Sequence, residues 1–304
     1  MPSANPFLAV AKLVIYVAVA RLFPARSWGS IAHALATLSA LFLRGRRRRE
    51  IGQIEAVLDR SLTKDELPVV AAARSAGAFL TGFIVMGQKY AKGRSQNIRV
   101  HGLENVAAAR EAGKGTVLWL CPFTYMFLIA KMGLHQEGIE ISHLSREGHG
   151  FGRSRVAVRF LNRHWVDGEN LYVKERLVMI ADNETGALRA LRQCLKDNGI
   201  VSITLSKDGR KRASTPFLSG SLTVATGALG LAVSTGAAIL PVYTLRNDDG
   251  GFDVTVDRPL EPGPEAGRDA QFEHLVKDLA ARLTRLVTRH PEQWADWNLL
   301  SASE

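Results

Sequence analysis

The chain has 304 residues, of which 46% are hydrophobic, and its mean hydropathy is zero. This size and composition exclude a disordered protein and allow one large core or two modest ones. The two cysteines, Cys121 and Cys194, have no CxxC or Cys/His spacing, so the sequence indicates neither a disulfide framework nor a metal site.

The formal net charge of +10 comes from the first third of the chain. Residues 1–100 hold 15 Lys and Arg against 5 Asp and Glu, whereas residues 101–304 hold 24 of each kind. A nucleic-acid-binding protein more often spreads its basic residues and places aromatic residues among them. Positive charge confined to one apolar segment favours an anionic membrane surface as partner, and we expect no nucleic-acid partner.

The first 95 residues are predicted to form a helical, membrane-associating region. Residues 7–23 are apolar but shorter and more charged than the roughly 20 apolar residues of a spanning helix. A second apolar helix is expected at 31–43, and five arginines follow within residues 44–49. Each basic residue near anionic lipid contributes about 1 kcal/mol to membrane binding. The alternative is a solvated helix end, where arginines interact favourably with the C-terminal end of the helix dipole. Because no signal-peptide pattern is present, we expect a peripheral or monotopic protein.

Residues 63–90 predict a closely packed helix. Thr63 and Glu66 have the spacing of a capping box, which would open a helix over 67–90. This segment is rich in alanine and glycine, and small residues allow helices to approach closely. We therefore expect it to pack against the first two helices.

From residue 96 onward, strand and helix patterns alternate. The predicted strands are 98–101, 117–120, 139–144, 200–205, 238–245 and 252–256, the last two joined as a hairpin. The predicted helices are 103–112, 155–163, 185–198, 223–234 and 270–289, and Pro122 fits the first turn of another helix after 117–120. The alternation predicts an α/β domain over 96–304, with a largely parallel sheet flanked by helices.

Several segments occur together in the order of a known family. They are residues 98–116, the strand 117–120 with the apolar stretch after it, and residues 215–243. The most specific motifs are Pro216-Phe217-x-x-Gly220, the stretch from Thr235-Gly236-Ala237 to Pro241, and the ending His290-Pro-Glu-Gln-Trp294. Over nearly its whole length, the chain resembles the bacterial lipid A biosynthesis acyltransferases of the lauroyl/myristoyl type.

The resemblance implies a lysophospholipid-acyltransferase-like fold on the cytoplasmic face of the inner membrane. It also implies transfer of a fatty acyl chain from a thioester carrier, acyl carrier protein or acyl-CoA, to a hydroxyl of a glycolipid or similar lipid acceptor. No cofactor is expected, because the glycine-rich segment 219–230 lacks Walker spacing.

The catalytic pair of the family is missing from the expected place. The family uses an H-x4-E or H-x4-D pair just after the strand, in which the histidine is the general base and the acid orients it. The resemblance places these two residues at Pro122 and Phe127. A general base contributes about 10²–10⁴-fold to the rate, and proline cannot accept a proton. Either other side chains have taken over catalysis, or the chain is an inactive lipid-binding or partner-binding relative.

Three side chains are candidate catalytic replacements. His143 and His149 lie near the end of the predicted strand 139–144, where the active site of a parallel sheet would open, although histidines there can also be structural. Asp208 follows the strand 200–205 and would either position an acceptor hydroxyl or cap a turn.

Six further residues are candidate substrate-binding groups. Arg146 and Arg153 would bind phosphates or begin a solvated basic helix. Lys207 and Arg210 form a basic lip around Asp208. Thr124 and Tyr125 are the hydroxyls of the loop that lacks the catalytic pair, and packing is the alternative role for both.

Overall fold

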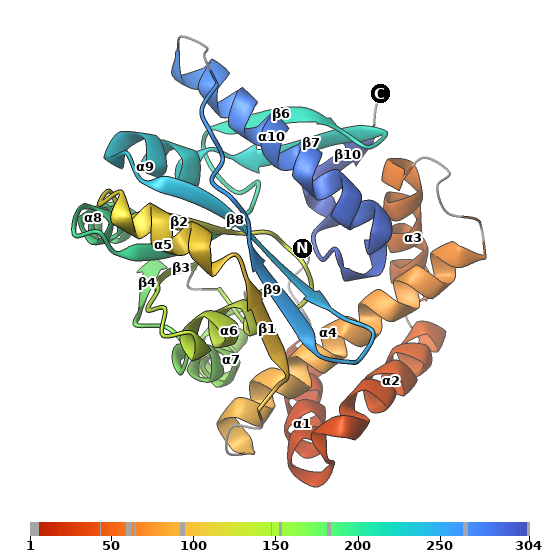
Figure 1. Cartoon of the computed structure of the whole chain (residues 1–304). Helices are drawn as coiled ribbons and strands as arrows, with labels where there is room; N and C mark the ends of the chain where they lie inside the picture. Colours follow the sequence, from red (N-terminus) through yellow and green to blue (C-terminus); the bar gives the residue numbers. More distant parts are fainter. Residues whose placement is uncertain are drawn as a thin grey trace.

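The computed structural model describes residues 6–42, 44–58, 63, 65–91, 95–146, 148–151, 154–180, 184–263 and 267–302. Its centre is a seven-stranded sheet with the order β1-β9-β8-β2-β5-β3-β4 (Figure 1). The strands are β1 (Ile98–His101), β2 (Thr116–Leu120), β3 (Ser142–Arg146), β4 (Glu175–Met179), β5 (Ile200–Thr204), β8 (Ala238–Arg246) and β9 (Phe252–Val256). Strands β8, β2, β5, β3 and β4 run parallel, and β9 turns back antiparallel beside β8. The predicted fold class is confirmed.

A second, three-stranded antiparallel sheet consists of β6 (Arg212–Phe217), β7 (Gly220–Ala225) and β10 (Leu300–Ala302). The sequence analysis did not predict this sheet. It predicted a helix over 223–234, and the first residues of that range were assigned wrongly. Residues 223–225 pair with β6, and the helix is α9 (Gly227–Thr235). Leu222 and Val224 point inward while Ser221 and Thr223 do not, so the period-2 pattern of a strand was present in the sequence.

The loop after β2 also differs from the prediction. The next helix, α6 (Ile129–Gln136), begins seven residues after Pro122, so Pro122 does not lie in a first helical turn. Residues of the C-terminal segment satisfy the loop backbone instead. The Thr124 amide donates to the Gln293 carbonyl and the Ala295 amide to the Pro122 carbonyl, both at 2.7 Å. Phe123 forms an isolated β-bridge with Trp294, so this part of the loop is held extended.

The other helices around the sheet largely follow the predicted ranges. They are α5 (Leu103–Glu111), α8 (Glu184–Lys196) and α10 (Arg268–Arg289), whereas α7 (Asn162–Asn170) was not predicted beyond residue 163. The helix expected at 155–163 is a π-helix, η2 (Ala157–Leu161), which continues into α7. Strand β3 lies a few residues later than predicted, and β4 was not predicted. Short 3-10 turns are η1 (Ala25–Ser27), η3 (Pro291–Gln293) and η4 (Trp297–Leu299).

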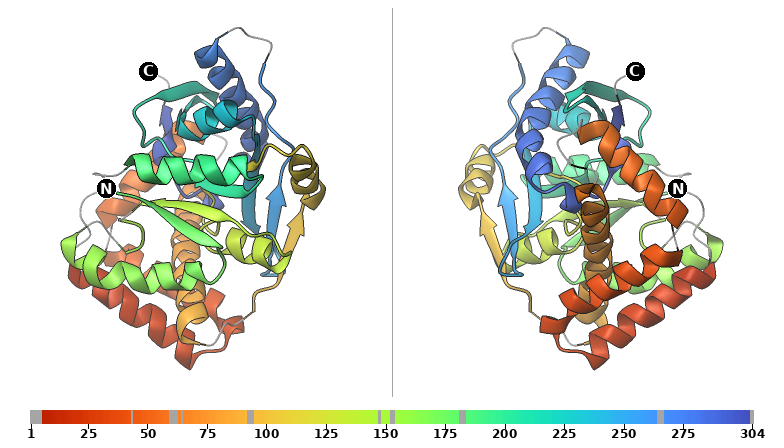
Figure 2. Two further views of the ribbon diagram at one scale, coloured as in Figure 1. Left: turned by 90° about the vertical axis from the view of Figure 1, so that its left-hand side faces the viewer. Right: turned by 90° about the vertical axis from the view of Figure 1, so that its right-hand side faces the viewer.

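The N-terminal region consists of α1 (Pro6–Leu22), α2 (Trp28–Phe42), α3 (Arg44–Leu58) and α4 (Glu66–Tyr90). The capping box is confirmed, because the Thr63 amide donates to Glu66 Oε2 at 2.7 Å and the Glu66 amide to Thr63 Oγ1 at 3.3 Å. The arginines of residues 44–49 begin α3 rather than end α2. Figure 2 shows α1 and α2 gathered with α4 at one end of the molecule.

The small residues of α4 lie where α1 and α2 cross it. Gly82 faces the Tyr16 ring of α1, and a Cβ built on Gly87 would lie 2.6 Å from the Trp28 ring of α2. Tyr16, Trp28 and Phe83 belong to the same apolar cluster as Leu118 of β2, so α1, α2 and α4 share one core with the sheet. Among the described residues, α4 alone is long and apolar enough to cross a bilayer, and 56% of its most apolar stretch is buried inside the protein.

Candidate functional site

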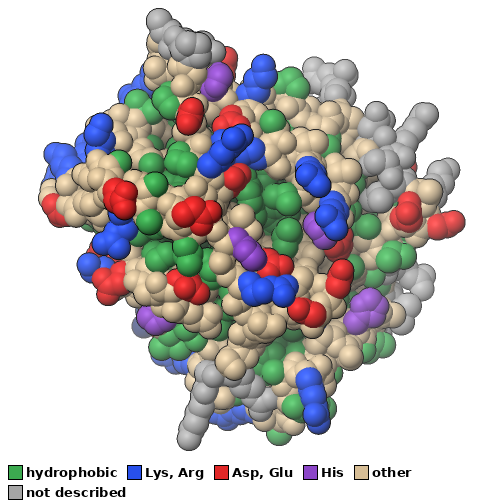
Figure 3. Space-filling view, in the orientation of Figure 1, with side chains coloured by type: hydrophobic (Ala, Val, Ile, Leu, Met, Phe, Trp, Pro, Cys, Tyr) green, Lys and Arg blue, Asp and Glu red, His purple; other side chains and the backbone are tan. Residues whose placement is uncertain are grey.

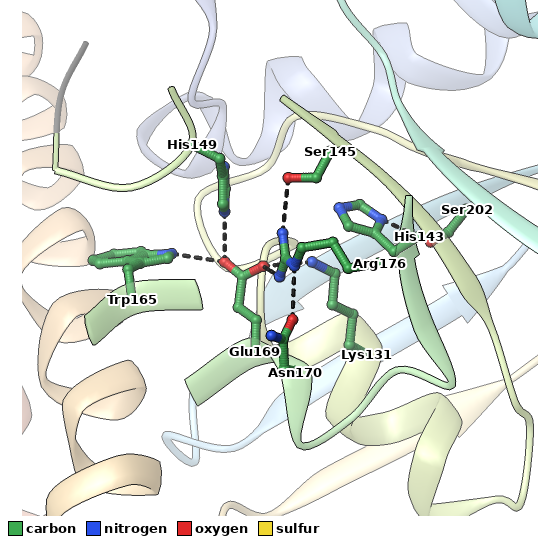
Figure 4. A network of polar contacts seen from close by, with 9 residues as sticks. All are labelled: Lys131, His143, Ser145, His149, Trp165, Glu169, Asn170, Arg176 and Ser202. Atoms are coloured by element: carbon green, nitrogen blue, oxygen red, sulfur yellow. Dashed lines mark hydrogen bonds and ion pairs between the residues drawn. The ribbon is translucent and has the colours of Figure 1, made fainter. Parts of the chain in front are cut away.

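A buried carboxylate, Glu169 of α7, lies at the centre of a polar cluster beside β3 and β4 (Figure 4). Oε1 accepts from His149 Nε2 and Trp165 Nε1, both at 2.7 Å. Oε2 accepts from Lys131 Nζ at 2.7 Å and from Arg176 Nη2 at 2.8 Å. Three elements and one loop thus direct donors at a single side chain, which leaves both of its oxygens satisfied.

The surrounding basic groups keep this carboxylate charged. Burial by itself would raise the pKa of Glu169, but His149, Lys131 and Arg176 together hold it well below its usual range. Burial also lowers the pKa of Lys131, and the attraction of Glu169 offsets only part of that effect. Glu169 is therefore ionised at neutral pH, and its charge is fully desolvated.

His149 is a partly exposed member of the cluster. It lies in the loop after β3, its side chain is 19% exposed, and its amide donates to the Arg146 carbonyl at 3.0 Å. Its ring packs against Phe127, with 5.5 Å between the ring centroids. A carboxylate bound to Nε2 fixes the proton there, so that Nδ1 carries the lone pair that can accept a proton. No described residue forms a hydrogen bond with Nδ1. A histidine–carboxylate pair therefore lies beside the loop where the sequence analysis expected one.

His143, the other histidine candidate, lies in the interior on β3. Its side chain is buried, and Nδ1 lies 2.8 Å from Ser202 Oγ on β5. Burial, followed by the nearby charge of Lys131, lowers the pKa of His143 well below its usual value. The ring is therefore neutral and is not accessible to a substrate.

Asp208 and Arg146 pair with each other at the strand ends. Arg146 Nη1 lies 3.0 Å from Asp208 Oδ2, Arg146 Nη2 donates to the Asp208 carbonyl at 2.7 Å, and both side chains are about half exposed. Lys207 Nζ donates to the Asn298 carbonyl at 2.6 Å, and Arg210 is an exposed residue of the loop that follows Asp208. The structure thus brings two of the predicted residues, Arg146 and Asp208, into contact next to the His149 loop, whereas Lys207 bonds to the C-terminal segment. Arg153 lies outside the described residues.

The two predicted hydroxyls turn inward. Thr124 Oγ1 donates to the Gln293 carbonyl at 3.0 Å, and the Tyr125 ring packs against Phe252 at 5.0 Å. Burial raises the pKa of Tyr125 to about 12. Both side chains are buried, which is the packing role that the sequence analysis gave as the alternative.

Comparison with known proteins agrees with this fold. The family model described as bacterial lipid A biosynthesis acyltransferase matches residues 6–297. The chain belongs to this family. No curated protein matches the chain.

In this lipid A acyltransferase family member, the loop after β2 is packed shut. Phe123 lies edge-on to Trp294 at 5.3 Å and to Tyr243 at 6.4 Å, and Pro122 is buried beside it. Two surface depressions, of about 330 and 380 Å³, lie elsewhere, one over β6 and α10 and the other between α4 and the C-terminal segment. Among the described residues, no group of three His, Cys, Asp or Glu side chains could hold a metal ion.

Sequence reasoning identified His149 but missed its four-membered surroundings. Glu169, Lys131, Arg176 and Trp165 come from α7, α6 and β4, and no local pattern connects them. One signal was present, because Lys131 is a single cation in an otherwise apolar stretch at residues 126–134. A lysine inside an apolar helix requires a buried partner, which would have directed the search to a carboxylate.

Proposed function

We propose that this protein is a membrane-associated acyltransferase that transfers a fatty acyl chain from a thioester carrier to a hydroxyl of a glycolipid or similar lipid. In this proposal, His149 is the general base and Glu169 orients it, in place of the pair that the family carries after β2. The observation that supports it is the 2.7 Å bond from His149 Nε2 to Glu169 Oε1, beside Phe127.

The proton transfer would proceed through His149 Nδ1, the ring nitrogen that is not bonded to Glu169. The acceptor hydroxyl gives its proton to His149 Nδ1 while its oxygen attacks the thioester carbonyl carbon. The tetrahedral intermediate then collapses, the C–S bond breaks, and His149 returns the proton to the departing thiolate. The products are an ester and the free thiol of the carrier. Glu169 remains ionised throughout and stabilises the imidazolium that forms in between.

The lip beside His149 offers the groups that bind the substrates. Arg146, Arg210 and Lys207 are cations near the strand ends. A guanidinium group can donate two parallel hydrogen bonds to one phosphate. A carrier, whether acyl carrier protein or acyl-CoA, has a phosphate on its pantetheine arm, and a glycolipid headgroup can carry one as well. We place the protein on the cytoplasmic face of the inner membrane, where such carriers occur.

The experiment is acyl transfer by purified protein, with acyl carrier protein and acyl-CoA donors and a panel of glycolipid acceptors. We expect His149→Gln to lower the rate by about 10²–10⁴-fold, the usual contribution of a general base. His101→Gln, on the exposed edge strand β1, is the matched control and should retain the native rate. Equal rates in the two variants would refute the assignment of His149.

A second candidate is an inactive lipid-binding member of the family. It is favoured by the packed loop at residues 121–126 and by the four donors that satisfy Glu169, since both features suit a structural role. In that case the native protein would transfer no acyl chain to any acceptor, and lipid would be detected by mass spectrometry in the purified protein. Measurable transfer by the native protein would exclude this candidate.

A further inference from the structure

The outer face of α1 is apolar and exposed to solvent. Phe7 is 83% exposed and Val14 61% exposed, and Leu8, Val10 and Ile15 are exposed on the same helix. The inner face, with Ala9, Tyr16, Val19 and Ala20, is buried. A helix on a water-facing surface normally places polar residues outward, so this face is not built for contact with water.

The neighbouring segment, residues 155–163, continues this surface with arginines added. Ala157 and Leu161 of η2 pack against Ala9 of α1 and join the two helices in one small core. On the outside, Val156 and Phe160 are exposed, the latter at 52%. Arg155, Arg159 and Arg163 are exposed between them at four-residue spacing, and the Arg159 guanidinium lies 5.6 Å from the Phe160 ring.

The C-terminal end of α1 is also basic. The Arg21 guanidinium lies 5.5 Å from the Tyr90 ring, and Lys89 Nζ lies 5.3 Å from the same ring. Asp167 forms an ion pair with Lys89. Its one negative charge is outnumbered by the three positive charges of Arg21, Lys89 and Arg163. Burial, followed by the charges of Lys89 and Arg163, lowers the pKa of His164, which is what a positive local potential produces.

These parts lie on one side of the molecule. Figure 2 shows α1 and the helix that follows residue 154 side by side at its lower edge. Neither α1 nor residues 155–163 contains an acidic residue. The face in Figure 3 differs, because acidic and basic side chains are interspersed over it. Apolar side chains framed by arginines, on two segments without acidic residues, match the acyl region and the anionic headgroups of a bilayer.

We propose that α1 and residues 155–163 form a single bilayer-docking face that binds anionic phospholipid. The exposed apolar side chains enter the acyl region, and Arg155, Arg159, Arg163 and Arg21 bind headgroup phosphates. These arginines are not the ones at residues 44–49, in α3, that the sequence analysis singled out for membrane binding.

The docking face also connects to the candidate site. The Phe151 ring lies 6.1 Å from the Tyr16 ring of α1 and 5.7 Å from the Trp165 ring, and Phe151 is two residues from His149. Docking through α1 would therefore hold the His149 loop near the bilayer surface, where a lipid acceptor resides. Only this step rests on the proposed function.

The test is sedimentation of the full chain with vesicles of phosphatidylcholine alone and of phosphatidylcholine with one quarter phosphatidylglycerol. We expect the native protein to prefer the anionic vesicles, and Val14→Asp and Phe160→Asp to reduce vesicle binding at least tenfold. Replacement of Arg155, Arg159 and Arg163 by Gln should remove the preference for phosphatidylglycerol. Val233→Asp on α9, at a residue 41% exposed, and Leu188→Asp on α8 are matched controls and should bind as the native protein does.

Three results would overturn the proposal. They are equal binding by Phe160→Asp and Val233→Asp, a preserved preference for phosphatidylglycerol in the triple arginine variant, and complete competition by millimolar inorganic phosphate, which would indicate a simple anion site. Circular dichroism checks that each variant is folded. The assay contains neither acyl donor nor acceptor, so absence of acyl transfer would refute the proposed function without changing this result.

Discussion

At the residue scale, the main finding is that one carboxylate gathers its partners from distant parts of the chain. Glu169 is bound by residues from 131 to 176, and the nearest of them, Trp165, is one helical turn away. His149 could be selected from the sequence because it follows a strand end, which is a local criterion. Its partner could not, because the partner is set by how α6, α7 and β4 meet, and that is a tertiary property.

His143 provides a prediction for stability. Its pKa in the folded state lies well below the value of about 6.5 in the unfolded chain, so below pH 6.5 the unfolded state binds a proton that the native state does not. Stability should therefore fall as the pH drops from 6.5, by at most about 1.4 kcal/mol per pH unit from this residue. Urea unfolding at pH 7 and pH 5 should show a smaller fall for His143→Gln than for the native protein.

The control for this titration is His101→Gln on the exposed edge of the sheet. Its fall in stability between pH 7 and pH 5 should be larger than that of His143→Gln. An unchanged fall in His143→Gln would mean that this histidine is not neutral in the folded state.

At the element scale, strands and helices followed local patterns, while the loop after β2 did not. Pro122 favours the start of a helix, yet the loop takes its backbone partners from η3 and the residues after it, such as Gln293, which lies 169 positions beyond its partner Thr124. Gln293 is itself fixed to β8, because its side chain bonds the Arg246 amide at 2.7 Å and the Arg246 carbonyl at 2.9 Å. The preference of Pro122 for the first turn of a helix was therefore outweighed by pairing with residues 293–295. Such long-range pairing cannot be predicted from the hydrophobic periodicity of the sequence.

The crossing of α2 over α4 gives a second prediction. A methyl group on Gly87 would meet the Trp28 ring at 2.6 Å, so Gly87→Ala should destabilise the protein by about 1–3 kcal/mol through overpacking. Gly52→Ala in α3 is the matched control, because no atom lies within 4 Å of the added methyl. In that helix, alanine should stabilise by about 0.5–1 kcal/mol. Thermal unfolding of the two variants should therefore shift in opposite directions.

At the scale of the whole molecule, the N-terminal helices belong to the same core as the sheet. The sequence analysis predicted a boundary near residue 95 between a helical region and an α/β domain, because the composition changes there. Composition, however, does not show which surfaces pack together. Trp28 lies in the apolar cluster that also contains Leu118 and Met126. Arg74 of α4 donates to the carbonyls of Trp294 and Ala295 at 3.1 and 2.6 Å, so the N-terminal region also contacts the C-terminal segment.

A shared core implies shared unfolding. Trp28→Ala should destabilise by about 3–5 kcal/mol, the usual cost of removing a large buried side chain. The loss should affect the sheet as well as the helices, so near-ultraviolet and far-ultraviolet circular dichroism should give one coincident urea transition for the native protein and the variant. Two separated transitions would show that residues 1–95 and 96–304 unfold independently.

The pairing of residues 293–295 with the loop after β2 has a consequence for biosynthesis. While the protein is being translated, β2 and residues 121–128 leave the ribosome long before their partners at 293–295 exist. A nascent chain therefore exposes the aromatic residues of this loop until late in synthesis. Chaperone binding at this segment, and its sensitivity to proteases on stalled ribosomes, should end only when the codons for residues 293–295 have been read and those residues have left the exit tunnel.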